Sequence, residues 1–446
     1  MGLLPLTYRR PAYIDAESIM KGSQSSLESA RSSGEKSAGS EDSLVAASLA
    51  AGVPPELSFD RIIRGATCPP CTLRDFMNYL VYVERSPENL QFFLWYRDYV
   101  QRFSEAKTAD VALAPPWTKE MEEEADMRFQ KEQAEKLRKE VKTPALAIFK
   151  GSDFEKAEDT QKVEFDSFSA SPLDSAKSEV VSEYVDSYVT SYRSQANDAF
   201  VNAGIKVPFT IQPFRHEIDR VIATYIMDGA PRQLNLADRE QKAVLMALAY
   251  TTHPSAFREA ARMAESMLRR QAHPNFVRWS ICNGNRARVV FARSLGVGLI
   301  VASTAVAIIL TLSRLGRGYR AFAAIGWVLG ISTLIAAWKG MCVVLHGLHH
   351  RHVRPWELFG DENGEDPLKQ SFDSFGTTNS YEEEPWVLRY ESRNIVRKIF
   401  DREVWIEEPA LRQIQDTIFV QSLLGALVLS GILTVIFVCL PGGNLF

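Results

Sequence analysis

The chain of 446 residues has only five cysteines, an odd number that argues against a disulfide scaffold and fits a reducing compartment for the soluble part. Two of them form the pair Cys68-Pro-Pro-Cys71, whose spacing could provide half of a zinc site or a redox pair. No second pair of this kind and no paired histidines follow at a useful distance. The sequence therefore favours a proline-stiffened turn in front of a helix.

The chain also lacks an excess of positive charge. Its 51 Lys and Arg residues against 55 Asp and Glu residues give a net charge of −4. Because phosphate binding needs a concentrated basic face, no nucleic-acid partner is expected. The sequence contains no nucleophile elbow, phosphate loop, zinc signature or dinucleotide fingerprint. We therefore expect no enzymatic chemistry of its own, no cofactor and no metal.

Two polar clusters resemble metal sites only in part. His346, His349, His350 and His352 are four of the seven histidines. His346 and His350 are expected on one helical face and could share a metal ion, but no carboxylate or cysteine completes the set. A partly protonated cap at a membrane interface is favoured. The acidic run 361–366 lacks the spacing of an EF-hand loop and predicts a solvated loop.

Large apolar residues are scarce near the N-terminus. Ser, Gly and charged residues dominate from Glu17 to about Ser48, so this stretch cannot bury enough surface to offset its ordering entropy. The opening MGLLPLTYRR has too short an apolar run for a signal peptide, and Leu6 stands where a myristoylation motif needs Ser or Thr. We predict a disordered region over residues 1–56.

Helical periodicity begins in the stretch from Phe76 to Tyr99, FMNYLVYVERSPENLQFFLWYRDY. Ser86 suits an N-cap and Pro87 a first helical position, so a second helix is expected to start at a sharp turn with Glu88 exposed. The residues at helical spacing that should turn the first helix toward a core are Phe76, Tyr79, Leu80 and Val83.

Residues 100–206 interrupt this patterning and predict a largely mobile insertion, in which Trp117 to Lys142 suits a solvated helix or a weak coiled coil. Patterning resumes near Val207, and Asn235 can cap a further helix. The residues expected to face the core are Phe214, Ile218, Val221, Ile222 and Tyr225, then Val244, Ala247 and Leu248, then Phe257, Ala260, Ala261, Ala264, Met267 and Leu268.

Several pieces of the sequence, in two blocks that cover about Leu73 to Trp279, occur in the order found in a known family. They are the pattern F-x-x-[YF]-L-x-x-x-E-x-x-x-E-N-L-x-F-x-L from Phe76, the loop Asn235-Leu236-Ala237-Asp238, and HPNFVRW over 273–279, which is expected to be a turn followed by Phe and an aliphatic residue. In this order they resemble the regulator of G-protein signalling (RGS) family. The resemblance implies an all-α fold, with an RGS-like helical bundle over residues 57–288 and residues 100–206 as its long insertion.

The resemblance also implies that exposed turns bind the switch regions of a GTP-bound Gα subunit. Gα supplies the catalytic groups, and the RGS domain only positions them. Glu88 and Asn89 match one contact turn, and Asn235 matches the amide that reaches the Gα glutamine. At the third turn Gln271 and Asn275 replace the family's Asp and Arg, which leaves acceleration of GTP hydrolysis in doubt. The alternative is that Asn89 and Asn235 only cap helices.

Three apolar runs occupy the last third of the chain, at residues 294–312, 321–345 and 418–440. Each is long enough to cross a bilayer, so we predict about three transmembrane helices, with residues 346–416 as a cytosolic connection. Gly326 and Gly330 have the spacing that permits close helix packing. The sequence leaves the oligomeric state open.

Flanking charge predicts the orientation of these helices. Arginines precede the first run, follow the second and precede the third, whereas no charge follows the third. The positive-inside rule then places the N-terminal region and residues 346–416 in the cytosol and the C-terminus outside. Arg314, Arg317 and Arg320 conflict with this orientation, because their short loop would face outward.

An RGS-like domain followed by three spans resembles the membrane-bound RGS proteins of fungi, of the polarity and bud-site-selection type. One expected function is a membrane-anchored regulator that accelerates GTP hydrolysis by Gα and attenuates G-protein signalling, with the anchor raising its local concentration. The other is a non-catalytic scaffold or polarity landmark that binds a polarity-complex membrane protein. Either would be a multi-pass protein of the plasma membrane or an endomembrane, with the RGS-like domain in the cytosol.

Overall fold

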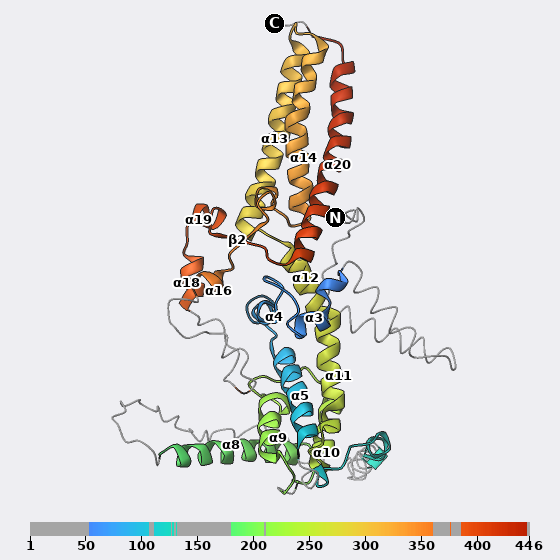
Figure 1. The fold of residues 1–446 in the computed structure, drawn as a ribbon, viewed down its shortest axis with the longest axis vertical. Helices are drawn as coiled ribbons and strands as arrows, with labels where there is room; N and C mark the ends of the chain where they lie inside the picture. The colour runs from blue at the N-terminus through green and yellow to red at the C-terminus, as the bar shows by residue number, and fades with distance from the viewer. Residues whose placement is uncertain are drawn as a thin grey trace, which may run out of the picture. The chain divides into compact units, whose positions relative to one another are not determined.

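The computed structural model describes residues 53–106, 111–125, 127–128, 131, 180–208, 211–359, 375 and 385–443. These residues are mostly helical, as expected, with one two-stranded sheet (Figure 1). The chain divides into two compact units, one made of residues 1–91 and 264–446 and the other of residues 92–263, and each is described by itself. Most of the predicted disordered region and about half of the insertion lie outside the described residues, as does the acidic run 361–366.

The first unit opens with α3 (Phe59–Ile63) and α4 (Leu73–Tyr79). Thr72 and Asp75 cap α4 reciprocally, because each side chain accepts a hydrogen bond from the other residue's backbone N–H, at 3.1 and 3.0 Å. The turn of Cys68-Pro-Pro-Cys71 precedes this cap, as predicted, with the Cys71 N–H donating to the Cys68 carbonyl over 2.9 Å.

A π-helical turn, η2 (Leu80–Glu84), continues α4. Phe76, Tyr79 and Leu80 are buried as predicted, but Val83 is 42% exposed. The prediction for Val83 is wrong because it assumed α-helical spacing, whereas the wider π-helical turn rotates residue 83 away from the core.

The first unit also contains the end of a long, unbroken helical stretch. It consists of α11 (Arg258–Met267), which begins in the second unit, the π-helical turn η6 (Leu268–Ala272) and α12 (His273–Ile281). The turn expected at residues 273–275 is therefore wrong. Pro274 is the second residue of α12, directly after η6, and the helix continues through it.

The second unit packs its helices around an aromatic core. They are α5 (Glu88–Glu105), which starts in the first unit, α8 (Val180–Asn202), α9 (Arg215–Val221), the π-helical turn η4 (Ile222–Ile226), α10 (Asp238–Tyr250) and the start of α11. Phe92 of α5 lies 5.6 Å from Tyr225 and 6.1 Å from Phe257 between ring centroids. Trp95 stacks on Tyr99 at 5.1 Å.

Most of the residues predicted between Phe214 and Leu268 to face a core are buried. Phe214 and Met267 are only half-buried, whereas the others are buried. Asn235 does not cap α10 as predicted, because α10 starts at Asp238, where the Glu240 carboxylate accepts from the Ala237 N–H over 3.0 Å. The insertion ends in α8, and from residue 191 onward, where burial is described, Ala196, Ala199 and Phe200 are its buried residues.

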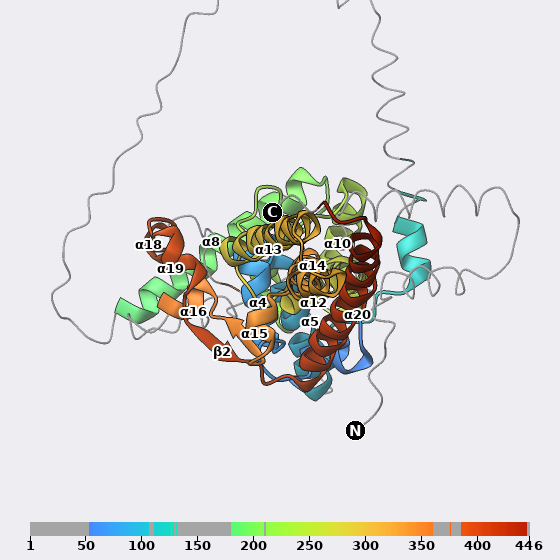
Figure 2. The ribbon, with the colours of Figure 1, turned by 90° about the horizontal axis from the view of Figure 1, so that it is seen from above.

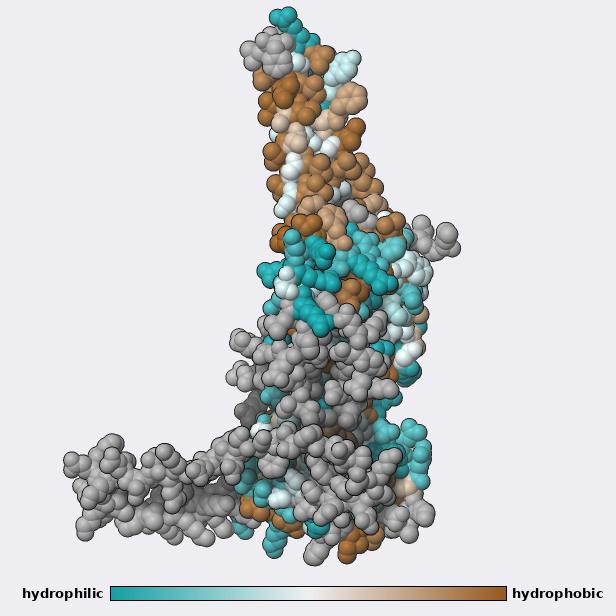
Figure 3. All heavy atoms as spheres, turned by 90° about the vertical axis from the view of Figure 1, so that its left-hand side faces the viewer, coloured by the Kyte–Doolittle hydropathy of each residue, from teal (hydrophilic) through white to brown (hydrophobic). Residues whose placement is uncertain are grey.

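Three helices of the first unit are long and apolar enough to cross a membrane: α13 (Arg286–Leu312), η7 (Arg317–Phe322) with α14 (Ala323–Trp338), and α20 (Pro409–Cys439). They span 27, 22 and 31 residues. Figures 1 and 2 show the three lying side by side. Their surface is mostly hydrophobic and gives way to a hydrophilic band at the end where α13 and α20 begin (Figure 3).

The second of these helices is shorter than predicted, since α14 ends at Trp338 rather than near residue 345. Gly340 is left-handed, with φ 84°, and the Met341 N–H bonds to the Ala336 carbonyl over 2.9 Å while the Gly340 N–H bonds to the Ala337 carbonyl over 3.1 Å. This is a Schellman C-cap, which needs a glycine. Hydropathy missed it because the residues after Gly340 are again apolar, and they include the short helix α15 (Val343–His346).

Close packing of α13 and α14 depends on small residues. A Cβ atom added to Gly330 would lie 2.9 Å from the Gly296 carbonyl oxygen and 2.7 Å from Ile300 Cγ1. One added to Gly326 would lie 1.9 Å from Ser303 Oγ. The predicted small-residue spacing on α14 therefore serves packing within one chain.

Residues 346–416 contain an unexpected sheet. Strand β1 (His350–His352) pairs antiparallel with β2 (Glu403–Trp405), with His350 opposite Trp405 and His352 opposite Glu403. Helices α16 (Pro355–Phe359), α18 (Pro385–Glu391) and α19 (Ile395–Ile399) lie between the two strands in sequence. The sheet ties the segment after α14 to the segment before α20.

Candidate functional site

Glu88 and Asn89 open α5 directly after a tight turn. Arg85 is left-handed there, with φ 56°. The Pro87 carbonyl accepts the first hydrogen bond of α5, from the Gln91 N–H at 2.9 Å, so the helix begins one residue later than predicted. Glu88 and Asn89 are half-buried, which leaves part of each side chain accessible. The Glu88 carboxylate also complements the positive end of the helix.

A titratable group lies beside this turn. Burial raises the pKa of Glu84 to about 7, although a hydrogen bond with Tyr79 opposes the shift. Its Oε2 atom is buried and accepts no hydrogen bond within the described part of the chain. Glu84 therefore changes charge near neutral pH, four residues before Glu88.

Asn235 lies in the second unit, exposed on the loop between η4 and α10. The loop is braced on both sides of it. The Leu234 N–H donates to the Tyr225 carbonyl over 2.9 Å, and the Gln241 amide of α10 donates to the Ile226 carbonyl over 2.6 Å. These bonds hold the Asn235 backbone in place while its amide faces solvent, an arrangement suited to contacting a partner.

Gln271 and Asn275 lie on continuous helix and not on the exposed turn expected for them. Gln271 belongs to η6, and its Oε1 atom is buried without a hydrogen-bond donor among the described residues. Asn275 belongs to α12 and is only 2% exposed. Asn275 therefore offers a partner almost no surface in this conformation.

The structure thus separates the five predicted contact residues by environment. Glu88, Asn89 and Gln271 are half-buried residues of the first unit, although the Oε1 atom of Gln271 is itself buried. Asn275 of the same unit is buried, and Asn235 is exposed on the second unit. Carboxylate and amide groups of this kind can bind and orient another molecule.

The described residues hold no group of three or more His, Cys, Asp or Glu side chains arranged for a metal ion. Cys71 is fully buried, and burial raises the pKa of its thiol. His346 ends α15, whereas His350 lies in β1, so the helical face expected to carry both is absent.

A carboxylate nevertheless reaches the histidines. Asp416 Oδ1 lies 3.4 Å from His346 Nε2 and 3.3 Å from His349 Nε2. Burial lowers the pKa of His346, although the Asp416 charge raises it. The predicted cap at this end of α14 is therefore an Asp-linked pair of histidines, a contact that the sequence did not reveal.

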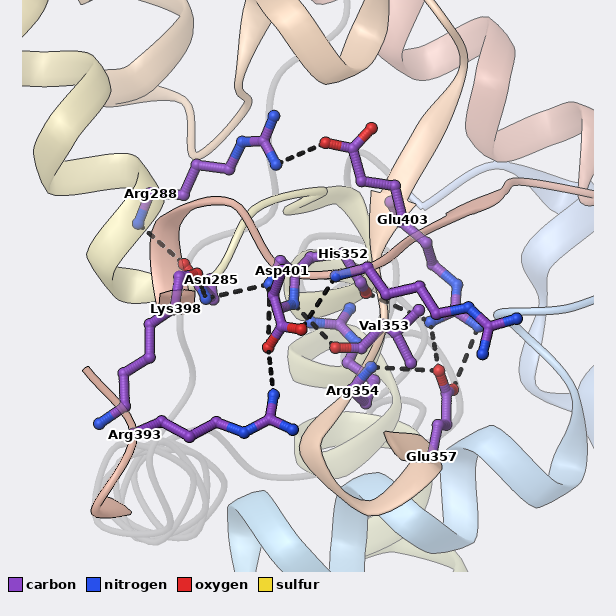
Figure 4. A network of polar contacts seen from close by, with 12 residues as sticks. Asn285, Arg288, His352, Val353, Arg354, Glu357, Arg393, Lys398, Asp401 and Glu403 are labelled. Carbon is purple, nitrogen blue, oxygen red and sulfur yellow. Dashed lines mark hydrogen bonds and ion pairs between the residues drawn. The ribbon is translucent and has the colours of Figure 1, made fainter. Parts of the chain in front are cut away.

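A second polar network joins the base of α13 to the two strands (Figure 4). Asn285 caps α13 by accepting from the Arg288 N–H over 2.8 Å, and its amide donates to the Lys398 carbonyl over 2.5 Å. The guanidinium of Arg288, only 7% exposed, bonds to Glu403 of β2 at 2.6 Å. The bonds to Lys398 and to Glu403 join residues more than one hundred positions apart in sequence.

Asp401 is the second centre of this network. It accepts from Arg393 at 3.0 Å and lies 4.0 Å from His352 of β1 (Figure 4). Burial lowers the pKa of His352, and a hydrogen bond to the Val353 carbonyl at 2.7 Å opposes the shift. The network fixes the position of residues 393–405 against the base of α13.

Arg320, one of the arginines that conflicted with the predicted orientation, is 1% exposed. Its Nη1 atom donates to the Phe437 carbonyl over 2.9 Å and to the Leu440 carbonyl over 2.7 Å, and Nη2 donates to the Thr311 carbonyl over 3.5 Å. These oxygens lie at the C-terminal ends of α20 and α13, where carbonyls lack intrahelical partners. Arg320 therefore caps two helices, and it is not an exposed loop arginine of the kind that the positive-inside rule counts.

No family model, no curated protein and no solved structure matches this chain.

Proposed function

We infer that the chain is a multi-pass membrane protein whose helical domain binds GTP-bound Gα in the cytosol and accelerates its GTP hydrolysis, as an RGS-domain regulator. The anchor is formed by α13, α14 and α20, which are compatible with membrane insertion by length and composition. Anchoring concentrates the domain near a membrane-bound partner. The plasma membrane and an endomembrane both fit this proposal.

The observation that carries the proposal is that the amide side chains of Asn89 and Asn235 lie on segments held by backbone hydrogen bonds. Asn89 lies in the first turn of α5, and Asn235 lies on the loop braced by the Leu234 and Gln241 hydrogen bonds. A GTPase-activating contact must be held in place before the transition state forms, because its effect comes from positioning. Side chains on mobile loops would lose much of that effect to ordering entropy.

The burial of Asn275 supports a second candidate, a non-catalytic scaffold or polarity landmark. Where the family uses a charged anchor, this chain has a side chain that is 2% exposed. Without that anchor the same domain could bind a polarity-complex membrane protein and leave GTP hydrolysis unchanged.

Single-turnover GTP hydrolysis by the Gα subunits of the source organism separates the two candidates. We expect the full chain, purified in detergent, to accelerate hydrolysis, and Asn89→Ala or Asn235→Ala to reduce that acceleration by about tenfold or more, as expected when a preorganised contact is lost. Asn202→Ala is the matched control, because Asn202 is an exposed asparagine at the end of α8. If the folded chain accelerates hydrolysis by none of these subunits, the regulator is contradicted and the scaffold is the remaining candidate.

A further inference from the structure

The segment around α19 carries large apolar side chains that the described part of the protein leaves uncovered. Ile395, Val396 and Phe400 are 65%, 56% and 69% exposed, and Trp405 of β2 is 48% exposed. A cluster of this kind outside a folded core marks an interaction surface. We call residues 395–405 the interfacial segment.

Ring contacts place the interfacial segment at the base of two apolar helices. Phe400 meets Phe291 of α13 edge to face, with 6.0 Å between centroids, and Arg412 of α20 lies over the Trp405 ring at 4.5 Å from its centroid. Phe291 precedes Ser294, where the uncharged run of α13 begins, by about 4.5 Å along the helix axis. In a bilayer crossed by α13 and α20, the segment therefore lies at the level of the lipid headgroups.

The charges of the segment suit an anionic surface. Arg397 and Arg402 are exposed. The acids beside them are already paired, Asp401 with Arg393 at 3.0 Å and Glu403 with Arg288 at 2.6 Å (Figure 4). The exposed acids Glu391 and Glu407 lie outside the segment, on either side of it. Apolar and aromatic side chains next to arginines are the combination that binds at a membrane interface.

We propose that the interfacial segment inserts Ile395, Val396 and Phe400 among the lipids and binds anionic phospholipid headgroups through Arg397 and Arg402. The proposal rests on the membrane anchoring inferred above, and not on any contact with Gα. The polar network of Asn285, Asp401 and Glu403 would hold the segment in the orientation that this binding needs.

Retention of phosphatidylserine by the full chain tests the proposal. The protein is reconstituted in phosphatidylcholine nanodiscs with a minor share of phosphatidylserine, then transferred to mild detergent, and native mass spectrometry counts the lipids that remain bound. We expect the wild type to retain phosphatidylserine. Retention should fall by about 25-fold or more in Arg397→Glu/Arg402→Glu, because each arginine near an anionic surface contributes about fivefold. Arg397→Lys/Arg402→Lys should keep most of it.

The double variant Arg314→Glu/Arg317→Glu is the matched control, since it makes the same charge change at the opposite end of the helices. It should retain phosphatidylserine as the wild type does. Equal losses in both glutamate variants, or retention of phosphatidylcholine alone, would overturn the proposal while the anchoring stands. Release of the chain from cell membranes by alkaline carbonate would overturn the anchoring and the lipid site together.

Discussion

Replacing Arg320 with methionine is expected to lower the free energy of unfolding by about 3 kcal/mol. The guanidinium is 1% exposed and donates to carbonyls at the ends of two helices, Thr311 of α13 and Phe437 and Leu440 of α20. Methionine fills much of the space but leaves these oxygens without a charged donor. Thermal unfolding of the full chain in detergent measures the loss.

Arg317→Met is the control for this variant. Arg317 belongs to the same short helix, η7, but its side chain is exposed. Its loss should cost no more than about 0.5 kcal/mol, as is usual for an exposed residue. Similar destabilisation by the two substitutions would show that Arg320 does not act as a cap.

Gly330→Val is expected to disrupt the packing of α13 against α14 at a cost of about 2 kcal/mol. The new Cβ would lie 2.9 Å from the Gly296 carbonyl oxygen, a backbone atom that cannot rotate away. The two helices must therefore separate or shift along each other. The midpoint of thermal unfolding and the yield of monodisperse protein in detergent both report this change.

Gly298→Val tests whether the effect arises from the contact and not from a β-branched residue in an apolar helix. Gly298 lies in α13, and a Cβ added there meets no atom within 4 Å. This variant should unfold at the wild-type temperature. If it is as unstable as Gly330→Val, close packing at Gly330 is not what holds α13 and α14 together.

Apolar periodicity predicted the helical core well. Ile218, Val221, Ile222 and Tyr225 are all buried, as are Val244, Ala247 and Leu248 on α10. The three apolar runs likewise appear as long helices. Both predictions succeed because each depends on the order of apolar residues alone. A helix buried on one face has apolar residues at helical spacing, and a membrane-spanning helix is apolar on all sides.

The sequence was less informative where a helix ends or changes its winding. Gly340 terminates α14 through backbone hydrogen bonds, yet the residues after it remain apolar. The π-helical turns rotate Val83 outward and carry the helix through Pro274 without the expected turn. No simple pattern of side-chain types predicts where a helix ends or where it changes to π-helical winding, because both depend on backbone geometry.

The polar networks could not be predicted at all, since their partners are distant in sequence. Arg288 meets Glu403, and Asp416 meets both His346 and His349, only after the helices have packed. Among the expected contact residues, Glu88 was placed at a helix start from local capping rules. The burial of Asn275 depends on α12, which replaced the expected turn.

The proposed membrane anchor requires that α13, α14 and α20 cross a bilayer. Two native thiols allow the crossing of α20 to be tested. Cys68 and Cys439 are exposed. The Cys68 N–H bonds to Glu408 at the N-cap of α20, and Cys439 is the last residue of that helix. The 31 residues of α20 separate its two ends by about 46 Å, more than the thickness of the hydrocarbon core.

The measurement is labelling by a membrane-impermeant maleimide in sealed vesicles of known orientation, with Cys68→Ser and Cys439→Ser as identity controls. We predict that Cys439 reacts only from the non-cytosolic side and Cys68 only from the cytosolic side. Labelling of both thiols from one side would contradict a spanning α20, and with it the membrane anchor.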